Sequence, residues 1–155
     1  MSNRRQPKNP VVKVHFPLDP EEDGICGENM WCEPAGNGLY KLWSVPYTVR
    51  GVSLHDIIRA KEIDGRLTFV SVAIRAGHST YAYVKLDDTR FDEFWLPLAE
   101  LGIESSKSEG VIAIDIPSRA DIFDVRRAFR RGQEAGVWDC EEMTCGHLMA
   151  LALAS

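Results

Sequence analysis

The stretch "GRLTFVSVAIRAGHSTYAYVKLDD", residues 65–88, contains two runs in which apolar and polar side chains alternate, the pattern of half-buried β-strands. The apolar or aromatic positions of the two runs are Val70, Val72, Ile74, Tyr81 and Tyr83. Between the runs, "AGHS" has the length of a hairpin loop, and Gly77 can adopt the positive φ that such loops need. The stretch therefore predicts two neighbouring antiparallel strands joined by a hairpin.

The chain before this stretch contains further short strands and two strong turn signals. Residues 11–16 alternate in the same way. The dipeptides Asn37-Gly38 and Asp64-Gly65 are typical of two-residue hairpin turns, because both residue types tolerate positive φ. Residues 11–86 therefore predict a meander of roughly six short antiparallel strands that curls into a small barrel or a curved sheet.

After residue 86 the period changes, and strands alternate with helices. Apolar residues at helical spacing predict one helix that is capped by Asp88 and ends at Gly102. A second helix is expected to begin at the N-cap Ser118 and to stop at Gly136. The predicted fold is α+β: the N-terminal meander is joined to a β-α-β-α-β layer of the ferredoxin-like type, over about 81–142.

The length of 155 residues, 45% of them hydrophobic, suits one ordinary domain with its own core. Residues 1–10 are polar and proline-containing, and we expect a disordered tail there. A single α+β domain is expected over 11–142, followed at 143–155 by a C-terminal tail or a short docked helix. The patterns give no sign of two separate cores.

Composition excludes several classes of function. The formal net charge of -5 works against non-specific binding to phosphate backbones, so nucleic acid is not the expected partner. Neither a signal peptide nor an apolar run long enough for a membrane span is visible, and we expect a cytoplasmic protein with no membrane association.

The cysteine spacings match no common zinc or redox framework, so we expect free thiols, no metal and no cofactor. The four cysteines are Cys26, Cys32, Cys140 and Cys145. A metal site built from Cys140, Cys145 and His147, with Cys26 or Cys32 from a distant loop, is the alternative.

Three segments resemble a bacterial family catalogued as domain of unknown function number 4265. They are "SVPYTVRGVSLHDII", "GRLTFVSVAIRAGHSTYAYV" and "AIDIPSRADIFDVRRAF" with the following "GVWDCEE". The shared marks are a Val-Pro-aromatic step before Arg50-Gly51, an aspartate at Asp56, and a Gly-x-Ser-Thr turn at 77–80. The resemblance covers roughly residues 11–142 and implies a small cytoplasmic bacterial protein. It implies no activity and no catalytic residues.

His78 and Ser79 first suggest a base beside its nucleophile. Neighbouring residues of an extended chain point to opposite faces, which is the wrong geometry for that hydrogen bond. A catalytic cluster of His55, Asp56 and His78 is a second hypothesis, and it requires two separate loops to meet in space. A ligand pocket at the junction of the barrel and the α/β layer is the third. Its expected residues are Arg50, Arg75, His78, Ser79 and Thr80.

Four arginines share one arc of the second predicted helix, opposite its apolar side. They are Arg126, Arg127, Arg130 and Arg131. This arc is either a solvated face or a docking face for an acidic protein or a nucleic acid, and the acidic residues 19–23 could instead face a basic partner. Our leading hypothesis is a non-enzymatic protein-interaction module of immunity or accessory type, with a protein partner and an unknown oligomeric state. The alternative is a small enzyme or ligand-binding domain that uses the His/Asp/Arg pocket.

Overall fold

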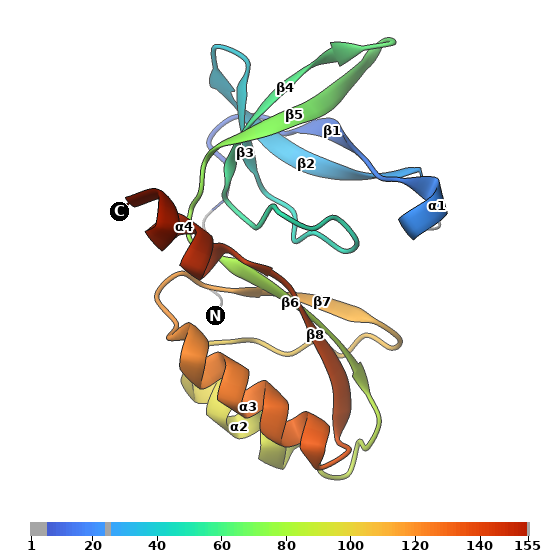
Figure 1. Ribbon diagram of the computed structural model, residues 1–155, viewed down its shortest axis with the longest axis vertical. Coiled ribbons are helices and arrows are strands. Elements are labelled where there is room, and N and C mark those ends of the chain that lie inside the picture. Colours follow the sequence, from blue (N-terminus) through green and yellow to red (C-terminus); the bar gives the residue numbers. More distant parts are fainter. Residues whose placement is uncertain (1–5, 24–25, 155) are drawn as a thin grey trace.

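The computed structural model describes residues 6–23 and 26–154, and it contains a closed five-stranded barrel and a separate three-stranded sheet (Figure 1). The barrel strands are β1 (Val12–Pro17), β2 (Gly27–Gly36), β3 (Leu39–Leu42), β4 (Ile57–Ile63) and β5 (Arg66–Ile74). Each strand pairs antiparallel with the next, and β5 closes the barrel through a parallel bridge from Thr68 to His15 of β1. A short helix, α1 (Pro20–Asp23), follows β1.

Both predicted hairpin turns are present in the barrel. Asn37 and Gly38 have φ of 56° and 73° and join β2 to β3, and Asp64 and Gly65 have φ of 52° and 76° and join β4 to β5. Two successive residues with positive φ match the right-handed twist of the flanking strands. The N-terminal meander is therefore confirmed as a barrel, with five strands in place of roughly six.

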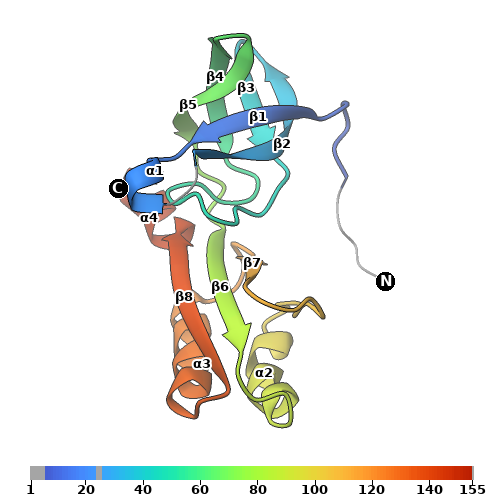
Figure 2. The ribbon, with the colours of Figure 1, turned by 90° about the vertical axis from the view of Figure 1, so that its right-hand side faces the viewer.

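The second sheet has the strand order β7-β6-β8, and two helices cover one of its faces (Figures 1 and 2). Its strands are β6 (Ser79–Lys85), β7 (Ile112–Ile116) and β8 (Trp138–Cys145), and its helices are α2 (Phe91–Glu100) and α3 (Ile122–Glu134). Because the central β6 is antiparallel to both neighbours, β7 and β8 run parallel and α3 connects them around β6. This is the expected split β-α-β, but a ferredoxin-like layer is not confirmed, because the sheet has three strands.

The predicted hairpin at "AGHS" is wrong. β5 pairs with β4 and β1, whereas β6 pairs with β7 and β8, so residues 75–78 carry the chain from one sheet to the other. Alternation predicts that a segment is a strand, but it does not say which strand lies beside it. Gly77 does adopt a positive φ, of 86°.

The helix ends differ in part from prediction. The carboxylate of Asp87, rather than that of Asp88, accepts the amide of Thr89 before α2. Asp121, rather than Ser118, caps α3, because its side chain accepts the amides of Phe123 and Asp124. The predicted stops are confirmed, since Gly102 and Gly136 have φ of 84° and 73°.

The buried hydrophobic side chains form two clusters, one inside the barrel and one between the second sheet and its helices. The barrel core includes Val14, Phe16, Met30, Leu42 and Ile58. The other core is richer in aromatic rings and includes Tyr81, Tyr83, Trp95, Phe129 and Trp138. Gly132 of α3 is required there, because a Cβ atom at this position would overlap the indole ring of Trp138.

The two ends of the described chain lie beside other elements. Residues 6–10 have neither helix nor strand, and the amide of Asn9 donates to the carboxylate of Glu33 at 2.8 Å. Residues 1–5, the first half of the expected disordered tail, lie outside the described residues. α4 (Gly146–Ala154) follows β8 directly and lies at the junction of the two sheets (Figures 1 and 2). No helix in the described residues is long and apolar enough to cross a membrane.

Candidate functional site

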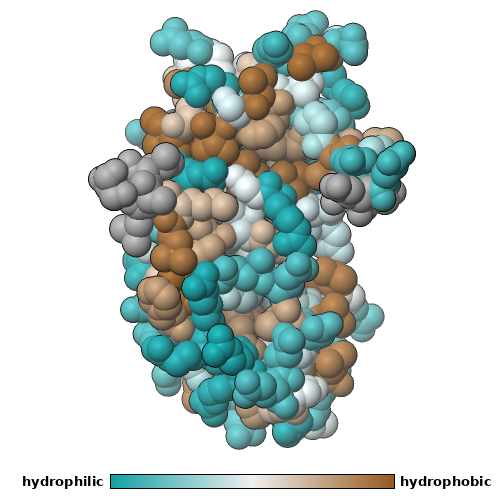
Figure 3. Space-filling model, in the orientation of Figure 1, coloured by the Kyte–Doolittle hydropathy of each residue, from teal (hydrophilic) through white to brown (hydrophobic). Residues whose placement is uncertain are grey.

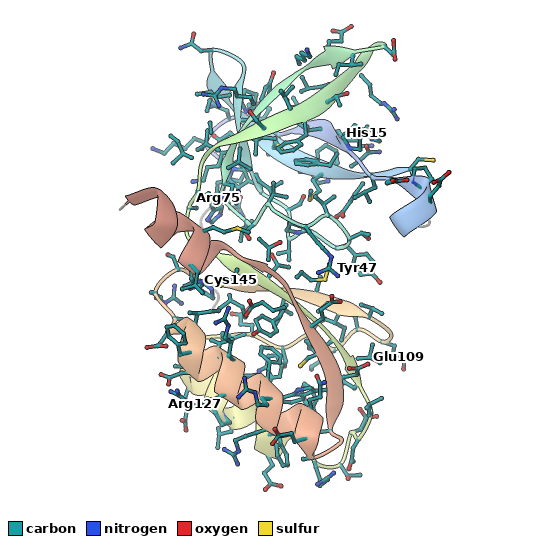
Figure 4. All side chains as sticks on the ribbon, in the orientation of Figure 1. His15, Tyr47, Arg75, Glu109, Arg127 and Cys145 are labelled. Atoms are coloured by element: carbon teal, nitrogen blue, oxygen red, sulfur yellow. The ribbon has the colours of Figure 1, made fainter. Side chains whose placement is uncertain are left out.

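The residues of the predicted His/Asp/Arg pocket gather where the barrel meets the second sheet, around the linker 75–78. Asp56, which is 1% exposed, holds this linker: Oδ1 accepts the amide of Ala76 at 2.9 Å and Oδ2 accepts the amide of Ser53 at 3.0 Å. The guanidinium of Arg75 lies 3.9 Å from Oδ2 and donates to the carbonyl of Gly51. Burial raises the pKa of Asp56. Asp56 and Arg75 therefore both attach the linker to the barrel. Figure 4 shows Arg75 at this junction.

His55 and His78 meet at the junction, as the cluster hypothesis required. Their ring centroids are 5.1 Å apart in an edge-to-face arrangement. Asp115 of β7, and not Asp56, binds His78, since its carboxylate oxygens lie 2.8 and 3.0 Å from Nδ1. An imidazole held by a carboxylate is a geometry that general bases use. The sequence offered one signal for Asp115, which is the single charged residue within the isoleucine-rich β7.

Ser79 binds a different histidine. Its Oγ lies 2.6 Å from Nδ1 of His147, and Nε2 of the same ring lies 2.9 Å from the carbonyl oxygen of Pro117. Because a carbonyl only accepts, Nε2 carries the proton and Nδ1 accepts from the serine hydroxyl. Ser79 is 0% exposed, so this pair attaches α4 to β6 and does not present a nucleophile. His78 and Ser79 thus have different side-chain partners, Asp115 and His147.

The remaining ligand candidates connect the two sheets. Arg50 forms an exposed ion pair with Glu141 of β8, and the amide of Gly51 donates to Thr144 at 2.9 Å. Thr80 is 1% exposed, and within the described chain its hydroxyl has no hydrogen-bond partner. The structure therefore brings the predicted ligand set together but engages most of its polar atoms in contacts within the protein.

The four arginines of α3 do not form one surface. Arg126 donates twice to Glu142, at 2.8 Å in each bond, and the hydroxyl of Tyr81 donates to the same carboxylate. These bonds, led by those from Arg126, hold the pKa of Glu142 below its ordinary value, whereas burial raises that of Tyr81. Arg126 lies beside the apolar face of α3, and its side chain reaches Glu142 of β8, so it helps to hold the helix against the sheet. Arg127, Arg130 and Arg131 are exposed.

The residues considered for a metal site have other partners. Both ring nitrogens of His147 are engaged as described, and Cys145 Sγ lies 3.5 Å from a guanidinium nitrogen of Arg126 (Figure 4 labels Cys145 at the end of β8). Among the described residues, no three His, Cys, Asp or Glu side chains are grouped so that they could hold a metal ion.

Two hollows lie away from the junction. One, of about 20 Å³, is between α2 and α3 and is lined by Glu93, Phe94, Pro97, Ala128 and Arg131. The other, an open hollow of about 570 Å³, is lined by Trp95, Ala99, Gly102, Ile103, Glu104 and Ser105. Neither hollow includes a residue that the sequence suggested for ligand binding.

Comparison with known proteins identifies the family. Residues 28–140 match the model of a domain of unknown function (DUF4265). The chain belongs to the DUF4265 family. The resemblance inferred from sequence is confirmed, and the DUF4265 family brings no established activity.

One solved structure is similar to this DUF4265 protein in fold. It is described as a novel crystal structure of a hypothetical protein from Neisseria gonorrhoeae. The TM-score is 0.74 at 19% sequence identity, over 89% of this chain and 97% of that chain. No curated protein matches the chain. The arrangement of barrel and three-stranded sheet thus recurs in a chain of very different sequence.

Proposed function

We propose that the protein is a non-enzymatic protein-interaction module of accessory or immunity type. The junction supports this proposal indirectly, because Asp56, Ser79 and Arg75 use their polar atoms to hold linker, helix and strand in place. A catalytic residue needs polar atoms that can reach a substrate. The alternative, a small enzyme or ligand-binding domain, retains one supporting feature, the carboxylate-bound His78.

The observation that carries the proposal is the arginine surface, which we define as Arg127, Arg130 and Arg131 of α3. All three side chains are exposed, and within the described residues Arg130 and Arg131 form no ion pair. Figure 4 shows Arg127 on the outer side of α3, and in Figure 3 the surface over the two helices is mostly hydrophilic. Unpaired guanidinium groups are available to carboxylates of a partner.

Aromatic rings flank these arginines. Phe123 is 55% exposed, and the guanidinium carbons of Arg90 and Arg131 lie 5.7 and 5.9 Å from the ring centroid of Phe94. Arginine and aromatic side chains are enriched at the centres of protein interfaces. The partner we infer is therefore a protein with an acidic surface that also offers some apolar contact.

The test compares two triple charge reversals in affinity purification from the native cell. Arg127→Glu, Arg130→Glu and Arg131→Glu remove the arginine surface. The matched control is Arg59→Glu, Lys61→Glu and Arg66→Glu, which changes the same net charge at exposed positions of the barrel. We expect wild type and control to retain one stoichiometric partner and the first variant to lose it. The proposal fails if wild type recovers no such partner, or if both variants lose it equally.

A further inference from the structure

A row of rings and cations runs along the outer face of the barrel. Lys13 of β1 lies directly opposite Trp31 of β2, and the amide of Trp43, which follows β3, donates to the carbonyl of Trp31 at 2.9 Å. The neighbouring pair of Cys32 and Leu42 points into the barrel core, so the tryptophans point outward. Trp31 is 50% exposed. We call Lys13, Trp31, Trp43 and Lys41 the tryptophan row.

Each indole of the tryptophan row has a lysine beside it. Lys13 Nζ lies 5.5 Å from the ring of Trp31, and Lys41 Nζ lies 4.9 Å from that of Trp43. The row continues toward the junction through histidine, because the ring of His55 lies 4.7 Å from that of Trp43. The two indoles are therefore neighbours, each with its own lysine, on β1, β2 and β3, which lie side by side in the barrel (Figure 2).

The acidity of the chain is not evenly distributed. Residues 1–78 contain ten basic residues (Lys and Arg) and nine acidic residues (Asp and Glu). Residues 79–155 contain eight basic and fourteen acidic residues. Residues 79–155 thus have a net charge of -6 and residues 1–78 one of +1, although the barrel segment 12–74 alone has six Lys and Arg, nine Asp and Glu, and a net charge of -3. The average charge therefore argues against nucleic acid for the barrel as well, and the case for it depends on the local cations Lys13 and Lys41 beside the two tryptophans.

The carboxylate of Glu33 lies beside the row. Glu33 accepts the indole N–H of Trp43 at 3.0 Å and the amide of Asn9 at 2.8 Å. The bond from Asn9 is the main reason that the pKa of Glu33 is lowered, and the charge of Lys41 contributes to the same shift. Glu33 therefore fixes the orientation of Trp43, and the two lysines leave the row with a net positive charge.

We propose that the tryptophan row binds single-stranded nucleic acid. Every base has an apolar π-face that can stack on an indole, and the flanking lysines can contact the phosphates between successive bases. The row is open and extends over three β-strands. This shape suits several consecutive nucleotides of a nucleic-acid chain better than a single nucleotide, which would need an enclosed pocket. This inference is independent of the arginine surface, which lies on the other sheet's helices.

The experiment uses the full chain and fluorescence anisotropy of labelled oligothymidine and oligouridine of about 20 nucleotides, at about 50 mM salt. We expect saturable binding that weakens as salt is raised. Trp31→Ala and Trp43→Ala should each weaken binding by about 10-fold or more. Lys13→Glu should also weaken binding. The matched controls are Leu86→Ala and Ile63→Ala for the tryptophan variants, because they truncate exposed apolar residues elsewhere, and Lys61→Glu for Lys13→Glu. Thermal unfolding confirms that each variant is folded.

Several outcomes would overturn the proposal. The first is absence of binding at low salt, and the second is equal weakening by the row variants and their controls. Equal affinity for duplex DNA would show a purely electrostatic surface. Displacement of the strand by a nucleoside monophosphate at equal concentration would indicate a mononucleotide site. A protein partner lost on Trp31→Ala, with no oligonucleotide binding, would assign the row to protein recognition.

Discussion

The Oδ1 atom of Asp56 accepts a hydrogen bond from the amide of Ala76, 2.9 Å away and twenty residues later in the chain. Through this bond and the one from Ser53, a single buried carboxylate connects the loop before β4 to the linker between the sheets. The charge is costly to bury, and Arg75 is the nearest cation that offsets it.

Replacing this carboxylate by an amide should destabilise the protein. In Asp56→Asn, the NH₂ group faces one of the two backbone donors, and that donor loses its acceptor. We expect the free energy of unfolding to fall by about 1–3 kcal/mol, measured by urea denaturation. The control is Asp88→Asn, at an exposed position, which should have little effect. Equal losses in the two variants would show that Asp56 does not have this role.

The stability difference between wild type and Asp56→Asn should depend on pH. Because burial raises the pKa of Asp56 in the folded protein, the folded state binds this proton more tightly than the unfolded state. The contribution of Asp56 is therefore fully present below its ordinary pKa and is lost as pH rises through the folded value. Urea denaturation from pH 3.5 to about 7 should show wild type losing stability relative to Asp56→Asn, and the opposite trend would contradict the assignment.

Ser79 should matter for stability through His147. Ser79→Ala removes the hydroxyl that donates to Nδ1 of His147 at 2.6 Å, and it leaves that nitrogen without its partner. We expect a loss of about 1–3 kcal/mol and faster amide hydrogen exchange in α4, because this contact attaches the helix to β6. Ser118→Ala, at an exposed serine, is the control. Unchanged exchange in α4 would show that other contacts attach it.

The ion pair between Arg126 and Glu142 should stabilise the fold, unlike the rest of the arginine arc. Glu142→Gln weakens both bonds from Arg126 and should lower the free energy of unfolding by about 1–3 kcal/mol at pH 7. Because the pKa of Glu142 is lowered in the folded state, this stabilisation is present above its ordinary pKa and is lost as pH falls through the folded value. Arg127→Ala, at an exposed position, should change stability little. The measurement is urea denaturation of wild type and Glu142→Gln at pH 7 and pH 3. A stability difference between them that is as large at pH 3 as at pH 7 would refute the prediction.

The four thiols should react at very different rates. Burial raises the pKa of Cys32 to about 12 and is the main reason that the pKa of Cys140 is raised to about 11, whereas Cys26 is exposed. Since the thiolate is the reactive form, iodoacetamide at pH 8 should modify Cys26 first, as followed by mass spectrometry. Denatured protein is the control and should lose the difference. Modification of Cys32 as fast as Cys26 would be inconsistent with the buried thiol.

Local sequence signals predicted local structure well. The Asn37-Gly38 and Asp64-Gly65 turns and the stops at Gly102 and Gly136 were predicted correctly, because each depends on the φ of one or two residues. Partner choice between strands is a long-range property, and for this reason the link at 75–78 was mistaken for a hairpin. The same limit applies at the site: His78 and Ser79 could be named from the sequence, but their partners, Asp115 for His78 and His147 for Ser79, could not be paired with them.

All five strands of the barrel precede the linker, and every strand of the second sheet follows it. During synthesis the barrel can therefore close while the rest of the chain is still being made. The second sheet is complete only when β8 has emerged, because the central β6 needs a neighbour that is translated more than fifty residues later. The order of the two sheets along the chain thus allows the barrel, with the Asp56 contact to the linker, to form before the second sheet is complete.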